Sequence, residues 1–117
     1  MDNTFAVIER FQSLVKKGMF YASYANDFIF DDSVDNTIAI SYLNIAVSKF
    51  SAAEAFYYSN FDILERDEAE TIFAQFETFA REFLNNVRTD HSHQWTDIEY
   101  EKLKELYENS ALVSKKS

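Results

Sequence analysis

The stretch that decides the fold is NTIAISYLNIAVSKFSAAEAFYYSNF, from Asn36 to Phe61. It carries only two charged residues, Lys49 and Glu54, in a chain that is otherwise rich in charge. Apolar residues recur in it at alternating steps of four and three, which places them on one face of a helix. These residues are Ala39, Leu43, Ala46, Phe50, Ala53 and Tyr57, and Tyr42, Ile45, Val47 and Phe56 widen the apolar surface beyond one stripe. A helix that is apolar over most of its circumference needs neighbours on several sides, so we expect a central helix over about 36–59.

The composition favours long helices in one domain. The chain has 117 residues, which is enough for one domain with a core that needs no disulfide or metal. It has no proline and one glycine, Gly18, whereas hairpins and tight turns depend on these residue types. We therefore predict an all-α fold, a compact bundle of four main helices that forms a single domain over residues 1–117. The predicted helices cover about 4–30, 36–59, 66–87 and 97–112, and we expect a frayed tail at 114–117.

The other three predicted helices have apolar stripes of their own. The stripe of the first is Phe5, Ile8, Phe11, Val15, Met19, Ala22, Ala25 and Ile29. The stripe of the third is Ala69, Ile72, Phe73, Phe76, Phe79, Ala80, Phe83, Leu84 and Val87, and in the last helix Leu103, Leu106 and Tyr107 are expected to point inward. Gly18 interrupts the first stripe at a cost of up to about 1 kcal/mol relative to alanine, which indicates a kink or a close helix contact. Thr96 and Glu99 have the spacing of a capping box at the start of the last helix.

Aromatic residues are more numerous than a small helical core usually needs, with twelve Phe, seven Tyr and one Trp. Four of them in the first helix lie partly off its apolar stripe: Phe20, Tyr21, Tyr24 and Phe28. This second aromatic face either packs on a neighbouring helix or forms a contact between two copies of the chain. The sequence leaves both interpretations open.

The formal net charge of −9 limits the partners. Such a chain repels nucleic acid at long range, and it suits a basic partner as well as plain solubility. The residues that we expect to form an acidic binding face are Asp62, Glu65, Asp67, Glu68 and Glu70. We therefore expect a small acidic interaction protein that binds and inhibits or regulates a protein with a basic surface. Antitoxins, immunity proteins and phage-encoded inhibitors act in this way.

The residue types present argue against a cofactor or a metal. The chain has no cysteine, which excludes disulfides and thiolate metal sites. The acidic link at 31–36, with Asp27 before it, lacks the glycine and the closing glutamate of an EF-hand, so helix capping explains it better. His91 and His93 form a His-x-His pair beside Asp90, but no further histidine or cysteine completes a zinc site. No signal-peptide pattern and no membrane-length apolar run is visible, and we expect a cytoplasmic protein with no membrane partner.

One spacing points to an enzyme. Arg88 precedes His93 with four residues between them, at the point where the third predicted helix ends. With this motif, the order of its helices and the Ala- and aromatic-rich segment at 46–58, the chain resembles the HEPN superfamily, small four-helix domains of prokaryotic toxins and defence systems. Ribonucleases of that family carry an arginine followed a few residues later by a histidine, and members usually dimerise so that two motifs share one cleft.

The resemblance implies a metal-independent endoribonuclease. Arg88 would hold the scissile phosphate, and His93 would assist proton transfer at the ribose 2′-hydroxyl. These roles are chemically sound, because a guanidinium stabilises phosphoryl charge and imidazole titrates near neutral pH. The other interpretation is that Arg88 caps the C-terminal end of the third helix and that both histidines are exposed in the following link.

Three classes of function therefore remain open, and the balance of the sequence favours a protein that is not an enzyme. The interaction protein requires a continuous acidic face. The ribonuclease requires a symmetric dimer in which Arg88 and His93 face a shared groove. The third class is a structural or scaffolding subunit, which requires a large apolar face and no concave site.

Overall fold

The computed structural model describes residues 3–29, 36–89 and 94–112. Its helices are α1 (Thr4–Ile29), α2 (Asn36–Ser59), α3 (Phe61–Leu64), α4 (Asp67–Thr89) and α5 (Gln94–Glu108), and the described ranges contain no strand. Four of the helices are long and α3 is a single turn, so the predicted all-α bundle of four main helices is confirmed.

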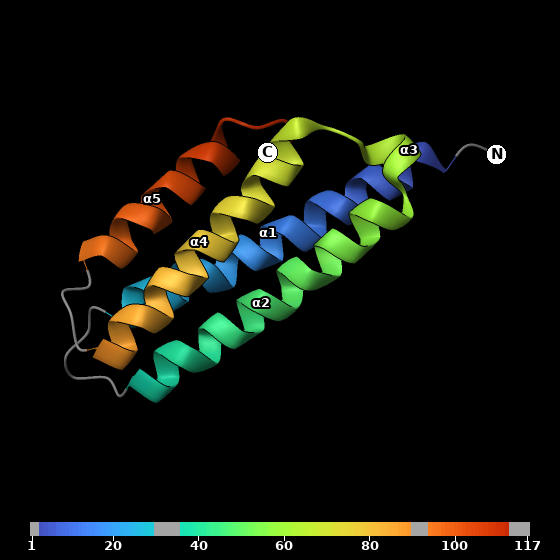
Figure 1. Ribbon diagram of the computed structural model, residues 1–117. Coiled ribbons are helices and arrows are strands. Elements are labelled where there is room, and N and C mark those ends of the chain that lie inside the picture. The colour runs from blue at the N-terminus through green and yellow to red at the C-terminus, as the bar shows by residue number, and fades with distance from the viewer. Residues whose placement is uncertain (1–2, 30–35, 90–93, 113–117) are drawn as a thin grey trace.

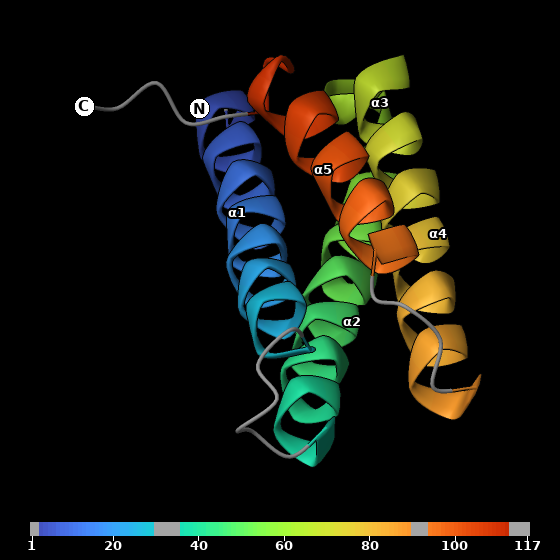
Figure 2. The same ribbon diagram turned by 90° about the vertical axis from the view of Figure 1, so that its left-hand side faces the viewer.

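The four long helices are arranged as two antiparallel pairs (Figure 1). α1 packs along α2, α4 packs along α5, and α3 connects the pairs at one end. α1 also contacts α5, and α2 also contacts α4, so the helices follow the order α1, α2, α4, α5 around the bundle (Figure 2). The result is an elongated molecule with extents of 53 × 27 × 21 Å.

The core follows the predicted stripe of α2 but not the wider apolar surface. All six stripe residues are buried, and Tyr42 and Phe56 pack against them from the side. Ile38, Ile45 and Val47 are exposed instead. α2 does have neighbours on several sides, since it contacts α1, α3 and α4, but α5 packs on α1 and α4 and leaves the outer side of α2 uncovered.

In α1 and α4, too, some residues of the predicted apolar stripes are exposed. The four phenylalanines of α4 at 73, 76, 79 and 83 are buried as predicted. Leu84 was assigned to the same stripe but is 49% exposed. Phe5 and Ile8, in the first turns of α1, are exposed as well. The apolar pattern of a helix therefore extends beyond the part of it that neighbouring helices cover.

Gly18 marks a close contact between α1 and α2. A Cβ atom added at this position would lie 2.7 Å from two atoms of the Phe50 ring. That ring cannot easily move away, because it is stacked on Phe76 with centroids 4.1 Å apart. Of the two alternatives for this glycine, the structure therefore shows the close helix contact.

Tyr57 fixes the junction between α2 and α4. Its buried hydroxyl donates to a carboxylate oxygen of Glu70 at 2.8 Å and accepts from the Arg66 backbone N–H at 3.0 Å. Burial raises the pKa of Tyr57, and the neighbouring carboxylate of Glu70 raises it further. α3 lies between the second and third predicted helices, where no helix was predicted, and Leu64 anchors this single turn in the core.

The predicted capping box at Thr96 was wrong. α5 begins at Gln94, so Thr96 lies inside the helix, where its buried hydroxyl accepts a hydrogen bond from the Asn86 side chain of α4. Glu99 also contacts α4, and its carboxylate accepts from Gln75 Nε2 at 2.9 Å. Both side chains therefore join α5 to α4 rather than cap α5.

Candidate functional site

Negative charge is concentrated in one half of the molecule. α1 and α2 together contain three acidic and four basic residues, whereas the sequence from Asp62 to Glu108 contains thirteen acidic and five basic residues. The second region includes α3, α4 and α5. A negatively charged binding site is therefore expected on these three helices.

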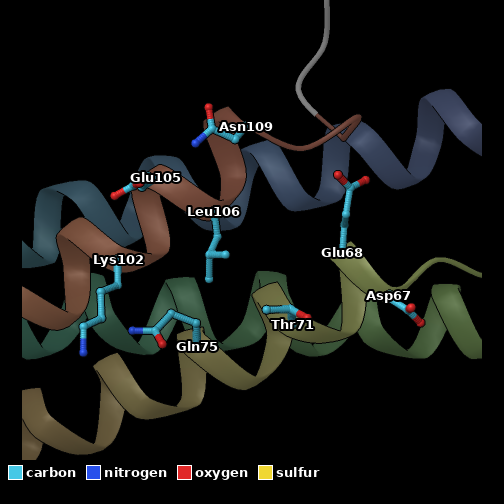
Figure 3. A pocket seen from close by; sticks show the side chains of 8 residues that line it. All are labelled: Asp67, Glu68, Thr71, Gln75, Lys102, Glu105, Leu106 and Asn109. Atoms are coloured by element: carbon cyan, nitrogen blue, oxygen red, sulfur yellow. The ribbon is translucent and has the colours of Figure 1, made fainter.

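A groove with a volume of about 560 Å³ lies between α4 and α5 (Figure 3). Such a volume is in the range of small-molecule ligand sites, which are usually roughly 300–1,000 Å³. The side chains that line the groove are Asp67, Glu68, Thr71 and Gln75 of α4, and Lys102, Glu105, Leu106 and Asn109 from α5 and its C-terminal end. Leu106 and Lys102 extend from α5 toward α4, so an apolar and a charged side chain form adjacent parts of one surface (Figure 3).

The groove is negatively charged. Three of its side chains are carboxylates, and the one ammonium group, that of Lys102, is 3.6 Å from a carboxylate oxygen of Glu99. Glu68 is 3.2 Å from the Arg66 guanidinium and also accepts from the Ala111 backbone N–H at 3.3 Å. Within the described part of the chain, Asp67 and Glu105 have neither a hydrogen bond nor an ion pair through their side chains. These two carboxylates are therefore available to a partner.

The five residues predicted to form an acidic face are divided among different surroundings. Asp67 and Glu68 line the groove. Glu70 lies three residues after Asp67 but faces α2, where it accepts the hydrogen bond from Tyr57. Asp62 and Glu65 are exposed on α3 and just after it. The structure thus brings only two of the five into the groove.

The α5 side of the groove has no signature in the sequence. Leu106 was expected in the core but is 36% exposed, and it forms the apolar part of the groove. Glu105 of α5 had no distinguishing pattern, nor had Gln75 on the α4 side, since carboxylates and amides are frequent throughout this chain. Their relevance depends on how α5 packs on α4, which no local spacing reveals.

Of the predicted catalytic pair, only Arg88 lies in the part of the chain that the structure describes. Arg88 is exposed in the last turn of α4 and donates to Asn85 Oδ1 at 3.3 Å. It shares a surface hollow of about 470 Å³ with Arg81, Glu82, Leu84 and Asn85. His93 lies outside the described residues, as do His91, Asp90 and the acidic link at 31–35. The expected approach of Arg88 and His93 therefore stays a prediction.

Neither a metal cluster nor a membrane-spanning helix is found along residues 3–29, 36–89 and 94–112. No group of three or more His, Cys, Asp or Glu side chains in these ranges is arranged to hold a metal ion. None of the helices in the same ranges is long and apolar enough to span a bilayer.

Comparison with protein-family models, with curated proteins and with solved structures gives no match for this chain. The resemblance to the HEPN superfamily thus remains a prediction from the sequence.

Proposed function

We propose that this protein binds a protein partner with a basic surface in the groove between α4 and α5, and that it inhibits or regulates the partner in doing so. The observation that supports this most strongly is that Asp67 and Glu105, two carboxylates without an ion pair among the described residues, share one concave surface with the exposed Leu106. A concave site favours an interaction protein over a structural subunit, for which a large apolar face and no concave site were expected.

The lining of the groove indicates what the partner presents. Leu106 provides contact area for an apolar side chain, and the carboxylates on both sides attract lysine or arginine. From Asp67 to Gln75 the groove extends for about 12 Å along α4, which is roughly two helical turns. A short amphipathic segment with basic residues around one or two apolar anchors matches these features.

The charge of the whole molecule assists such binding. The excess of acidic residues on α3, α4 and α5 attracts a basic partner over a distance and increases the rate of encounter. Because exposed charges are screened within about 10 Å at 0.1 M salt, binding should weaken as the salt concentration rises. Once bound, the partner's basic surface is covered, and this is the basis of the proposed inhibition.

The test is a binding measurement with a designed peptide of about 18 residues that forms a helix with leucine on one face and lysine on the other. We expect the variant Asp67→Lys/Glu105→Lys to bind this peptide at least tenfold more weakly than the wild type, because it places cations where the peptide carries its own. Isothermal titration calorimetry at low salt measures the difference.

The matched control is Glu77→Lys/Glu82→Lys. It makes the same change in net charge, but at two residues of α4 that lie outside the groove. The proposal predicts a clearly smaller loss of affinity for this control. Equal losses in both variants would show that the peptide responds only to total charge, and the proposed groove site would then be wrong.

The ribonuclease is a second candidate, and the hollow at the C-terminal end of α4 supports it. Arg81 and Arg88 line this hollow together, which places two guanidinium groups in a region otherwise dominated by carboxylates. Two guanidinium groups are well suited to a phosphate. We expect a ribonuclease to cleave a mixed RNA panel in the presence of EDTA, and to lose this cleavage in Arg88→Ala and in His93→Ala. Wild-type protein that is inert at high concentration would eliminate this candidate.

A further inference from the structure

Five aromatic rings form a continuous cluster where α1 meets α2, on the side of the molecule away from α4. Phe20 lies 4.8 Å from Tyr24 between ring centroids, and Tyr24 lies 5.3 Å from Tyr42 of α2. Phe28 is stacked on Tyr42 at 5.3 Å, and Tyr21 lies 6.3 Å from it. Tyr21, Phe28 and Tyr42 pack against the core, but Phe20 is 52% exposed and Tyr24 is 39% exposed. The inner rings of this face pack on the neighbouring helix α2, whereas its outer rings form a surface that could contact a second copy of the chain.

The apolar surface continues onto α2. Ile38 and Ile45 flank Tyr42 at steps of four and three residues, so they share its face of the helix, and both are exposed. A contiguous exposed surface of this kind marks an interaction site more often than isolated apolar residues do. The proposed function does not use this surface.

The charges along the exposed face of α1 indicate which partner fits. Lys16 and Lys17 precede the two exposed rings, and Asp27 follows them. None of these three side chains has a hydrogen bond or an ion pair within residues 3–29, 36–89 and 94–112. The face is therefore basic at one end, aromatic in the middle and acidic at the other end.

Such a face is complementary to itself when one copy is reversed. Phe20 and Tyr24 lie at equal distances along α1 from the level of residue 22, and so do Lys17 and Asp27. A two-fold axis at this level therefore brings Phe20 of one copy to the same height along the helix as Tyr24 of the other, and Lys17 to the same height as Asp27, twice each. This is the isologous arrangement of a symmetric dimer.

We propose that two copies of this chain associate through antiparallel contact of their α1 helices, centred on Phe20 and Tyr24 and flanked by α2. The face available is adequate for this. α2 has 24 residues at about 1.5 Å each, which gives a length of about 36 Å. Two helices of about 10 Å diameter make the face about 20 Å wide. The product, roughly 700 Å², is close to the ~800 Å² per partner that specific interfaces bury.

Charge favours this orientation over others. The excess of carboxylates lies on α3, α4 and α5, while α1 and α2 together are nearly neutral. Contact through α1 and α2 keeps the two acidic halves apart, since α1 and α4 lie on opposite sides of the bundle (Figure 2). It also leaves the α4–α5 groove of each copy open, so dimerisation and groove binding can be tested separately.

The experiment is sedimentation equilibrium from about 1 to 500 µM, a range that detects dissociation constants from micromolar to submillimolar. We expect wild-type protein to dimerise with rising concentration, and Phe20→Glu to raise the dimer dissociation constant at least tenfold, because the axis places two carboxylates in the aromatic contact. Tyr58→Glu is the matched control, since it adds the same charge at an exposed aromatic residue of α2 outside this surface. It should leave the dimer unchanged.

A charge swap tests the antiparallel geometry. Lys17→Asp should weaken the dimer because the introduced carboxylate would then face Asp27 of the other copy, and Lys17→Asp/Asp27→Lys should restore it. All of these positions are exposed, so the variants should remain folded. Protein that stays monomeric at all concentrations would overturn the proposal, as would a dimer that Phe20→Glu does not weaken or a swap that fails to restore association.

Discussion

Phe79→Ala is expected to lower the free energy of unfolding by about 3–5 kcal/mol, the largest effect of any single substitution considered. Phe79 is fully buried in α4. Its ring lies 5.9 Å from that of Phe83 and 5.7 Å from that of Tyr100 of α5. Removing it leaves a cavity at the contact of the two helices that form the groove. Urea unfolding followed by circular dichroism measures the loss.

The control for this prediction is Phe5→Ala, the same chemical change at a residue that is 71% exposed. It should alter the free energy of unfolding by less than about 0.5 kcal/mol. A comparable loss in both variants would mean that α4 and α5 do not enclose Phe79 as described.

Gly18→Leu is expected to be the second most damaging change, with a loss of about 3 kcal/mol in the free energy of unfolding. A Cβ atom alone would approach the Phe50 ring to 2.7 Å, and a leucine side chain extends further into the same contact. The helix would gain about 1 kcal/mol from replacing glycine, but this gain is smaller than the cost of separating α1 from α2. Thermal and urea unfolding both report the loss.

A double-mutant cycle distinguishes this steric explanation from a flexible role of the glycine. Gly18→Ala should destabilise the wild-type protein, because its methyl group meets the ring of Phe50. In a Phe50→Ala background the same change should stabilise the protein, since only the helix propensity remains. If Gly18→Ala has the same sign in both backgrounds, the contact with Phe50 is not the reason for the glycine.

The residues that could be predicted are those whose position follows from one helix alone. The six-residue stripe of α2 and the buried phenylalanines of α4 follow directly from helical periodicity, because a single face is buried in each case. The predictions were wrong where the surroundings of a residue depend on how a second helix packs. Thr96 matches a local capping pattern, yet its hydroxyl bonds with Asn86 of α4 and α5 begins earlier. Ile45 is exposed because α5 packs elsewhere.

The candidate site was likewise predictable only for residues whose position follows from one helix. Asp67 was predicted from its place in the acidic start of α4, and it does line the groove. Glu105 and Leu106 were not, because they approach α4 only after α5 has folded back along it. The contact of Gln75 with Glu99, which holds the two helices together beside the groove, joins residues far apart in the sequence. A groove between two helices is therefore a tertiary feature that a single stripe does not encode.

The most direct test of the proposed function is a map of where the leucine–lysine peptide binds, obtained from ¹H–¹⁵N NMR spectra of the wild-type protein during a titration. We predict saturable shift changes concentrated at the residues that line the groove, above all Asp67, Thr71, Glu105 and Leu106. The same titration with leucine and glutamate in the peptide should give none. Shift changes spread evenly over the acidic surface, with Glu54 and Glu77 affected as much as Glu105, would contradict the groove as the binding site.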